Sequence, residues 1–343
     1  MRIAFRVDAS NSIGTGHLMR CIELANTLID VNIYSVFITS EDALSKSILE
    51  TSELKFITLD TLTLDTLTLE QDAIQTKRIL HSEKIDVLLV DHYQVNLDWQ
   101  SHVKAKNLII IDDLANRPHL CDLLIDTSDQ QKLELYKKLT KHNCECLIGP
   151  KYAIIRDEFL TSQTSNIEYD IFICFGGSDP DKYTFSSLKT LAKKSYTGKI
   201  CAVVGQGYNG FSLLQIWVKQ SNLNIHLFQD PNNLAQLMAQ SELIISAAGS
   251  MLFEAASLAK KIIMIKTDDN QIDNIKLFLK NQAALESDII NLNDVIIEIK
   301  NTKINLTQYS KKLCDGQGKF RISKAIKRLM EKNSNLKEVN RCK

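Results

Sequence analysis

The stretch IAFRVDASNSIGTGHLMRCIELANTLI (residues 3–29) decides the fold class, because a buried strand, a glycine loop and an amphipathic helix follow one another in it. Residues 3–7 form a short apolar run, and residues 18–29 place apolar side chains at helical spacing. Gly14 and Gly16 lie in the loop between them. Such a strand–loop–helix unit is typical of open parallel sheets, which bind ligands at the edge where the loops lie.

The same alternation of short Ile-, Val- and Leu-rich runs with helical patterns continues along the chain and divides into two series. The first series fills residues 1–160 and the second fills residues 167–304, with a C-terminal helix and polar tail at residues 305–343. The polar stretch Thr161–Asn166 is the candidate linker. We therefore expect an α/β protein with two parallel-sheet domains, whose ligand edges face one another across a cleft.

One segment stands apart from this alternation. Residues 58–70, TLDTLTLDTLTLE, repeat a Thr–Leu unit. Alternating Thr and Leu favours an extended strand, so we interpret the segment as an edge strand or a surface insertion and assign it no chemistry.

The composition excludes several classes of function. Lys plus Arg and Asp plus Glu both number 41, so the net charge is zero and a nucleic-acid partner is not expected. No apolar run reaches the length of a membrane-spanning helix, and the N-terminus lacks a signal-peptide core. Eight scattered cysteines show no zinc-site spacing, which favours reduced thiols. We expect a cytoplasmic protein without a membrane partner.

His17 is the first candidate for chemistry, because it lies where the first helix begins. The positive end of the helix dipole disfavours the imidazolium form, which leaves the neutral ring that a general base needs. Asp8, at the end of the preceding strand, is the candidate group that orients the ring. A helix cap without catalytic role explains His17 equally well. The loop lacks the third glycine of the dinucleotide-binding motif.

Two later strands of the first series also end in polar residues. The motif VDHY places Asp91 and Tyr93 at a strand's carboxyl end, where ligand contacts or a helix-capping role are both expected. Asp112 and Asp113 follow the next strand. A pair of acids can hold a divalent metal, but a structural role in the turn is favoured, and we predict no metal site.

The second series has two glycine-led turns that run from a strand toward a helix. Gly176, Gly177 and Ser178 form the first, and Gly249 and Ser250 form the second. Backbone N–H groups in such turns, and at the starts of the helices that follow, can bind phosphates.

Three further polar residues complete the candidate nucleotide site: Glu254, Asn270 and Gln271. Glu254 lies one turn into the helix and suits ribose hydroxyls. The alternative for Glu254 is a first-turn acid that stabilises the helix dipole.

In combination these pieces resemble a known family. Seven motifs occur in order over about residues 1–280: DASxxxGTGHxMRC (8–21), VDHY (90–93), IDDLAxR (111–117), GPxYAxxRxEF (149–159), FGGSDP (175–180), AAGSxxxE (247–254) and DNQ (269–271). The ordered set resembles the UDP-2,4-diacetamido-2,4,6-trideoxy-β-L-altropyranose hydrolases of the pseudaminic acid pathway (the PseG family) and their spore-coat polysaccharide relatives.

The resemblance implies a glycosyltransferase-B fold with two Rossmann-like domains, and hydrolysis of a UDP-sugar with inversion, without metal or cofactor. It implies His17 as the base and places Tyr93 near the sugar. It places the uridine diphosphate along Gly176–Ser178, Gly249–Glu254 and Asn270. The other substrate contacts expected from the matched motifs are Gly14, Gly16, Arg20, Arg156 and Gln271.

The resulting hypothesis is a hydrolase that cleaves the anomeric C–O bond of a small-molecule UDP-sugar to UDP and free sugar. The pathway supplies cell-surface glycans, including flagellin glycosylation. We expect a monomer or a weak homo-oligomer. The alternatives are a glycosyltransferase that uses the same UDP-sugar site with a hydroxyl acceptor, and a non-catalytic nucleotide-sugar binding protein.

Overall fold

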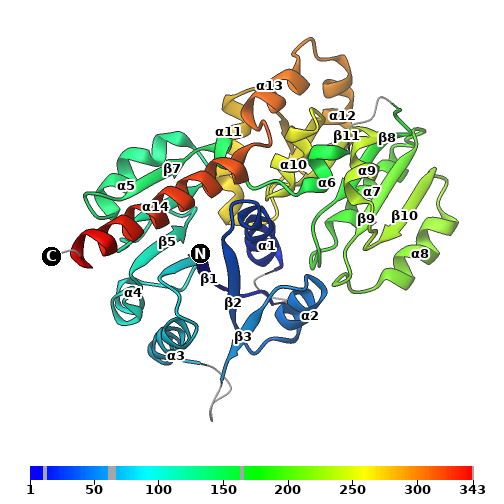
Figure 1. Ribbon diagram of the computed structural model, residues 1–343. Coiled ribbons are helices and arrows are strands. Elements are labelled where there is room, and N and C mark those ends of the chain that lie inside the picture. The colour runs from blue at the N-terminus through cyan, green and yellow to red at the C-terminus, as the bar shows by residue number, and fades with distance from the viewer. Residues whose placement is uncertain (11–13, 61–66, 163–165, 342–343) are drawn as a thin grey trace. The chain divides into compact units, whose positions relative to one another are not determined.

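The computed structural model describes residues 1–10, 14–60, 67–162 and 166–341, with side chains up to residue 332. The chain forms two compact units (Figure 1): unit 1 contains residues 1–154 and 317–343, and unit 2 contains residues 155–316. The chain thus crosses from unit 1 to unit 2 and back. The division expected from the sequence does not include this return of the last helix to unit 1.

Unit 1 is built on a sheet of seven parallel strands in the order β3-β2-β1-β4-β5-β6-β7. The order reverses between β1 and β4, so the carboxyl ends of these two strands form the switch point where ligands bind in such sheets. The strands are β1 (Arg2–Val7), β2 (Tyr34–Ser40), β3 (Phe56–Leu59), β4 (Val87–Asp91), β5 (Asn107–Ile111), β6 (Leu123–Asp126) and β7 (Glu145–Ile148).

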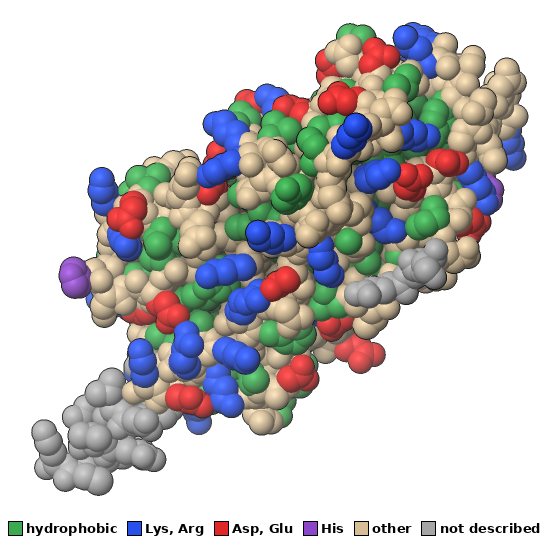
Figure 2. Space-filling model, turned by 90° about the horizontal axis from the view of Figure 1, so that it is seen from above, with side chains coloured by type: hydrophobic (Ala, Val, Ile, Leu, Met, Phe, Trp, Pro, Cys, Tyr) green, Lys and Arg blue, Asp and Glu red, His purple; other side chains and the backbone are tan. Residues whose placement is uncertain are grey.

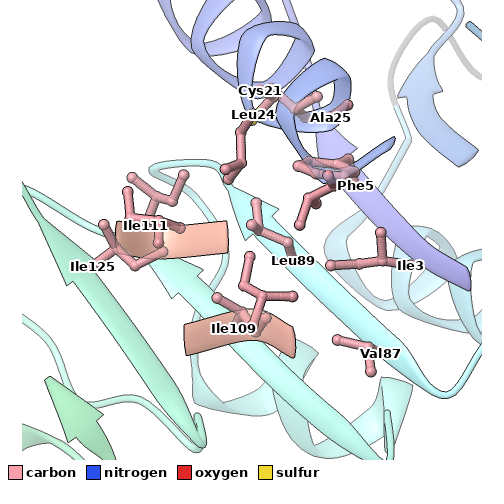
Figure 3. Close-up of a cluster of buried hydrophobic side chains, with 14 of the residues drawn as sticks. Ile3, Phe5, Cys21, Leu24, Ala25, Val87, Leu89, Ile109, Ile111 and Ile125 are labelled. Carbon is pink, nitrogen blue, oxygen red and sulfur yellow. The ribbon is translucent and has the colours of Figure 1, made fainter. Parts of the chain in front are cut away.

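Helices of unit 1 cover this sheet, and α1 lies over the central strands. Figure 3 shows Cys21, Leu24 and Ala25 of α1 above Ile3 and Phe5 of β1, all of them in one buried apolar cluster. The helices are α1 (Gly16–Ile29), α2 (Ala43–Thr51), α3 (Leu69–Ser82), α4 (Leu97–Val103), α5 (Leu133–Leu139) and α14 (Gly318–Arg341), with short 3₁₀ turns η1 (Gln130–Lys132) and η2 (Pro150–Tyr152).

The last helix joins the core of unit 1, because Ile322, Ala325 and Ile326 of α14 belong to the same cluster as the α1 residues. Its start lies close to the end of η2. A Cβ atom at Gly318 would lie 2.1 Å from the backbone oxygen of Ala153, so this approach requires glycine.

Unit 2 repeats the architecture with six parallel strands in the order β10-β9-β8-β11-β12-β13, and its order reverses between β8 and β11. The strands are β8 (Tyr169–Cys174), β9 (Ile200–Val204), β10 (Ile225–Gln229), β11 (Ser241–Ala247), β12 (Lys261–Ile265) and β13 (Leu285–Ser287). The helices are α6 (Asp157–Thr161), α7 (Tyr183–Lys193), α8 (Phe211–Gln220), α9 (Leu234–Ala239), α10 (Met251–Ser257), α11 (Ile272–Lys280), α12 (Leu292–Asn301) and α13 (Leu306–Leu313), with the 3₁₀ turn η3 (Asp269–Gln271).

The two parallel sheets expected from the sequence are therefore confirmed. Within the described ranges, the pattern did not predict β3 and β13, which are short edge strands. Residues 61–66 of the Thr–Leu repeat lie outside the described residues, and Thr68 caps the start of α3 through the N–H of Gln71.

On the face shown in Figure 2, groups of Lys and Arg side chains lie beside Asp and Glu side chains, as their equal totals lead us to expect. Among the described residues, no helix is both long enough and apolar enough to cross a membrane.

Candidate active site

His17 and Asp91 meet at the switch point of unit 1. His17 lies in the first turn of α1, and Asp91 is the last residue of β4, paired with Val7 of β1. The His17 Nδ1 and Asp91 Oδ1 atoms are 2.7 Å apart. The side chain of Asp91 is 1% exposed and that of His17 is 12% exposed, so water reaches the ring but hardly reaches the carboxylate.

This pairing fixes the protonation pattern of the His17 ring. Burial alone would raise the pKa of Asp91, but the guanidinium of Arg20 and the His17 ring lower it well below its usual range. An ionised carboxylate can only accept, so it takes the proton on Nδ1, an arrangement that leaves the lone pair of a neutral ring on Nε2. No residue within the described ranges forms a hydrogen bond with that Nε2 atom.

Arg20 lies one helical turn after His17 and binds the same carboxylate, that of Asp91. Its Nε donates to Asp91 Oδ2 at 2.5 Å, and its Nη2 donates to Asp91 Oδ1 at 2.6 Å. The same Nη2 lies 3.0 Å from His17 Nδ1. The sequence predicts Arg20 as a substrate contact, whereas the structure engages its guanidinium with Asp91.

Tyr93 completes the cluster. Its ring meets the His17 ring edge-on, with centroids 4.7 Å apart at an interplanar angle of 87°. The hydroxyl donates to Asp113 Oδ2 at 3.2 Å. Burial, followed by the Asp113 carboxylate, raises the pKa of Tyr93 above its usual value. The structure thus brings Tyr93 beside His17 as a neutral phenol.

Asp8 does not contact His17, which corrects its expected role as the orienting group. Its carboxylate accepts two hydrogen bonds from Arg6, at 2.6 and 2.8 Å, and others from Ser40 and from His92 Nε2. Burial opposes its ionisation, but the Arg6 guanidinium holds the pKa of Asp8 well below its usual range. Asp8 belongs to a buried charge network that extends to Asp72 of α3.

Strand alternation explains why Asp91 rather than Asp8 reaches the histidine. Successive side chains of a strand point to opposite faces. Phe5 and Val7 of β1 pack in the cluster with α1, so Arg6 and Asp8 point to the other face. On β4, Leu89 packs in the α1 cluster, and Asp91 two residues later shares its face.

The acids after β5 have a structural arrangement around Asp112. Asp112 Oδ2 accepts hydrogen bonds from the N–H of Ala115 and from the hydroxyl of Tyr136, and Oδ1 lies 3.0 Å from Arg117 Nη1. Burial opposes ionisation, but His119, Arg117 and the Ala115 N–H lower the pKa of Asp112 to about 2. Among the described residues, no group of three or more His, Cys, Asp or Glu could hold a metal ion.

The hydroxyl of Tyr136 lies between the buried carboxyl groups of Asp112 and Asp126. Its hydroxyl oxygen is 2.9 Å from Oδ2 of Asp112 and 2.9 Å from Oδ2 of Asp126, but it has one proton to donate. Burial raises the pKa of Asp126, and the Lys132 ammonium, whose Nζ lies 3.8 Å from Asp126 Oδ2, opposes that rise. The single hydroxyl proton of Tyr136 can satisfy only one of the two carboxyl groups at a time.

We predict that Asp126→Asn changes the free energy of unfolding by no more than about 1 kcal/mol, because Tyr136 has one proton for two carboxyl groups and the new amide can donate to its hydroxyl oxygen. Asp112→Asn should cost about 3–5 kcal/mol, because it leaves the buried side of Arg117 without its anion. Urea denaturation of both variants provides the comparison. Equal losses in the two variants would contradict this prediction, because they would show that both carboxyl groups stabilise the fold to the same degree.

Unit 2 presents its first candidate loop at the end of β8. Gly176 has a φ of +95°, and no atom lies within 4 Å of the position its Cβ would take, so a ligand can approach the backbone. The sequence predicts a helix start next to Gly177. However, α7 begins at Tyr183, and the carboxylate of Asp179 accepts the N–H groups of Tyr183 and Thr184. The loop itself, rather than α7, offers donors to a ligand.

A second loop, after β9, supports the first one and was not predicted. The N–H of Gly207 donates to the carbonyl of Gly177 at 3.1 Å. A Cβ at Gly205 would lie 2.3 Å from the same carbonyl oxygen. The glycines of GQG (residues 205–207) are the signal in the sequence, because they allow two backbones to approach this closely.

We predict that Gly205→Ala lowers stability by about 1–3 kcal/mol and weakens UDP binding, because the methyl group displaces the backbone of Gly177. Gly198→Ala is the matched control, since the nearest atoms to its Cβ are the hydroxyl, Cζ and Cε1 at the far end of the Tyr196 side chain rather than backbone. Thermal unfolding and UDP titration calorimetry of both variants test this. Equal behaviour of the two variants would show that the close approach does not matter.

The second candidate loop follows β11. Nothing lies within 4 Å of the position of a Gly249 Cβ, and the exposed Ser250 precedes the first residue of α10. The side chain of Gln271 joins this loop to the segment that follows β12. Its Oε1 accepts a hydrogen bond from the N–H of Ala248 at 3.2 Å and another from the N–H of Thr267 at 3.0 Å. Asn270 is exposed beside it.

Glu254 and Arg156, both predicted as substrate contacts, lie in unit 2 and bind one another. Arg156 Nε donates to Glu254 Oε1 at 2.8 Å, and Nη2 donates to Oε2 at 3.2 Å. Arg156 also pairs with Glu158 and lies over the ring of Phe159. Each carboxylate oxygen of Glu254 retains a further lone pair that can accept a hydroxyl proton.

Solved structures of low sequence identity share the fold over nearly the whole chain. MurG of Acinetobacter baumannii has a TM-score of 0.66 at 14% identity, with 95% of this chain and 99% of that chain covered. A UDP-GlcNAc 2-epimerase from Neisseria meningitidis bound to UDP-GlcNAc has a TM-score of 0.66 at 12% identity, with 96% and 100% covered. The glycosyltransferase-B type of fold, with two Rossmann-like domains, is confirmed.

Sequence comparisons identify the family. Residues 171–329 match the model of the glycosyltransferase family 28 C-terminal domain. The chain is 25% identical over 341 residues to the uncharacterized protein MJ1062 of Methanocaldococcus jannaschii. This match covers 95% of this chain and 66% of that protein. It is 30% identical over 293 residues to the UDP-2,4-diacetamido-2,4,6-trideoxy-β-L-altropyranose hydrolase of Campylobacter jejuni, with 79% of this chain and 94% of that protein covered. The chain belongs to the family of this hydrolase.

Proposed function

We propose that the chain hydrolyses UDP-2,4-diacetamido-2,4,6-trideoxy-β-L-altropyranose to UDP and the free sugar. The observation that carries the proposal is the His17–Asp91 pair at the switch point of unit 1. Asp91 holds the proton of the ring on Nδ1, so the Nε2 lone pair is available to a water molecule. Membership in the hydrolase family supplies the substrate.

In the proposed step, the oxygen of a water molecule attacks the anomeric carbon on the face opposite to the diphosphate. His17 Nε2 takes a proton from that water. The electron pair of the anomeric C–O bond leaves with the β-phosphate oxygen, so the configuration inverts. Tyr93 contacts the sugar as a neutral hydroxyl beside His17. General-base assistance of this kind contributes on the order of 10²–10⁴-fold in rate.

The uridine diphosphate is assigned to unit 2. Backbone N–H groups at Gly176–Ser178 and at Gly249–Ser250 bind the phosphates, because each loop has open space at a glycine, Gly176 or Gly249, where a ligand can approach the backbone. Glu254 accepts hydroxyls of the ribose, and Asn270 lies beside the same loop. Two solved structures with this fold hold UDP-GlcNAc and UDP-glucose, which supports a UDP-sugar as the ligand.

The reaction supplies a free sugar for pseudaminic acid biosynthesis, and through it for cell-surface glycans such as those on flagellin. We assign it to the cytoplasm, where nucleotide sugars are made. The reaction needs no cofactor in this scheme, because a diphosphate is already a good leaving group.

A glycosyltransferase is the second candidate, favoured by the match to the family 28 C-terminal domain. It would use the same UDP-sugar with a hydroxyl acceptor in place of water. Proton NMR of the purified chain with the UDP-sugar, and no acceptor, separates the two. The hydrolase releases UDP and free sugar in equal amounts, and the sugar first appears as the inverted anomer. Release that begins only after an acceptor is added would overturn the hydrolase.

A further inference from the structure

We infer that Arg20 is a positioning residue that holds the base and the sugar-facing tyrosine in place, and that it does not bind the substrate. The inference rests on the proposed function, because it concerns the same His17. It adds a role that the family resemblance does not give, since the matched motif predicts Arg20 as a substrate contact.

The first observation is that Arg20 binds Asp91 through two hydrogen bonds from its guanidinium group. Nε and Nη2 bind different oxygens of the carboxylate, at 2.5 and 2.6 Å. This two-point grip fixes the rotation of the carboxylate, whose Oδ1 meets His17 Nδ1 at 2.7 Å. A single ammonium group cannot reproduce the planar two-point geometry, so lysine is not equivalent at this position.

The second observation links the same guanidinium to Tyr93. The Nη1 atom of Arg20 lies 4.0 Å from Asp113 Oδ2, the oxygen that accepts the Tyr93 hydroxyl proton. One side chain therefore faces both the carboxylate that orients His17 and the carboxylate that orients Tyr93. Its side chain is 20% exposed, and three of its nitrogens already face Asp91 or Asp113.

The third observation places the guanidinium beside the ring itself, because Nη2 of Arg20 lies 3.0 Å from Nδ1 of His17. The Asp91 carboxylate contacts the same nitrogen, and the Tyr93 ring meets the His17 ring edge-on. Arg20 therefore contacts His17 directly as well as through Asp91.

The test compares Arg20→Lys and Arg20→Ala with wild type across a pH series. We expect kcat to fall on the order of 10- to 100-fold, since small misplacements of reacting groups cost this much, with KM changed by less than about threefold. Arg20→Lys should not restore kcat at any pH of the series, because one ammonium group cannot make the two-point contact with Asp91. A rise in KM with unchanged kcat would instead make Arg20 a substrate contact.

Arg2→Lys is the matched control, because Arg2 also forms a bond with a carboxylate, that of Glu83, but lies exposed in unit 1 away from His17. Its kinetic constants and pH profile should equal those of wild type.

A readout that does not depend on turnover separates this inference from the proposed function. Nitrogen-15 NMR should show His17 as the Nδ1-protonated tautomer in wild type and as a tautomer mixture in Arg20→Ala, with the resonance assigned by its loss in His17→Asn. The same tautomer in both proteins would overturn the role of Arg20. Absence of hydrolysis by wild type would overturn the proposed function alone.

Discussion

Replacing His17 with asparagine is expected to lower kcat by on the order of 10²–10⁴-fold while the affinity for UDP stays unchanged. Asparagine retains polar groups near the position of Nδ1 but has no basic atom at the position of Nε2. The UDP contacts are assigned to unit 2, whereas His17 lies on α1 of unit 1. Steady-state kinetics and UDP titration calorimetry on the same preparation measure both quantities.

His102→Asn is the control for this variant, because His102 lies exposed on α4 of unit 1 and its ring binds the carbonyl oxygen of Asp98. Its kcat should equal that of wild type. If His17→Asn retains more than a tenth of wild-type kcat, His17 has a structural role in the first turn of α1 and the base lies elsewhere.

Replacing Asp91 with asparagine is the change with the second-largest expected effect, a loss of kcat that approaches about 10⁴-fold. The amide can donate to Nδ1, which moves the ring proton to Nε2 and removes the lone pair that water needs. It also leaves Arg20 without its anion. Kinetics corrected for the folded fraction, measured by circular dichroism, isolate the loss in turnover.

Asp8→Asn is the informative comparison, since Asp8 directly follows β1, the strand next to β4, and carries the same carboxylate. Its partners are Arg6, Thr39, Ser40 and His92, so the variant should lose stability, by about 3–5 kcal/mol for a broken buried pair, and should keep its kcat per folded molecule. The opposite result, with turnover lost in Asp8→Asn and kept in Asp91→Asn, would restore Asp8 as the orienting group.

The pattern of the chain predicts the buried strands because both faces of a parallel sheet are covered, and such strands are continuous apolar runs. The runs at 87–91 and 200–204 coincide with β4 and β9. The edge strands β3 and β13 were missed, because each is only three or four residues long and is only partly buried.

Strand alternation could have distinguished Asp91 from Asp8. In IAFRVD, the apolar residues Ile3, Phe5 and Val7 alternate with Ala4 and Arg6, which places Asp8 on the face of the arginine. In VLLVD every residue is apolar before Asp91, so that strand gives no such signal. The face of Asp91 follows only once α1 is known to cover Val87 and Leu89.

The partners in unit 2 could not be predicted, because they join distant parts of the chain. Arg156 binds Glu254 across 98 residues, and the Gly205 backbone meets that of Gly177. Motifs indicate that each residue matters, but a single sequence does not indicate which partner it takes. The protein partners of Arg20 and Gln271, which the family motifs predict as substrate contacts, were likewise not visible in the sequence.

The central claim is that water activated by His17 attacks the anomeric carbon. Mass spectrometry of UDP formed during turnover in ¹⁸O-labelled water, without any acceptor, tests it most directly. The account predicts UDP without the label, because the anomeric C–O bond breaks and the phosphate keeps its own oxygen. The label in the β-phosphate of UDP, or no UDP release without an acceptor, would contradict it.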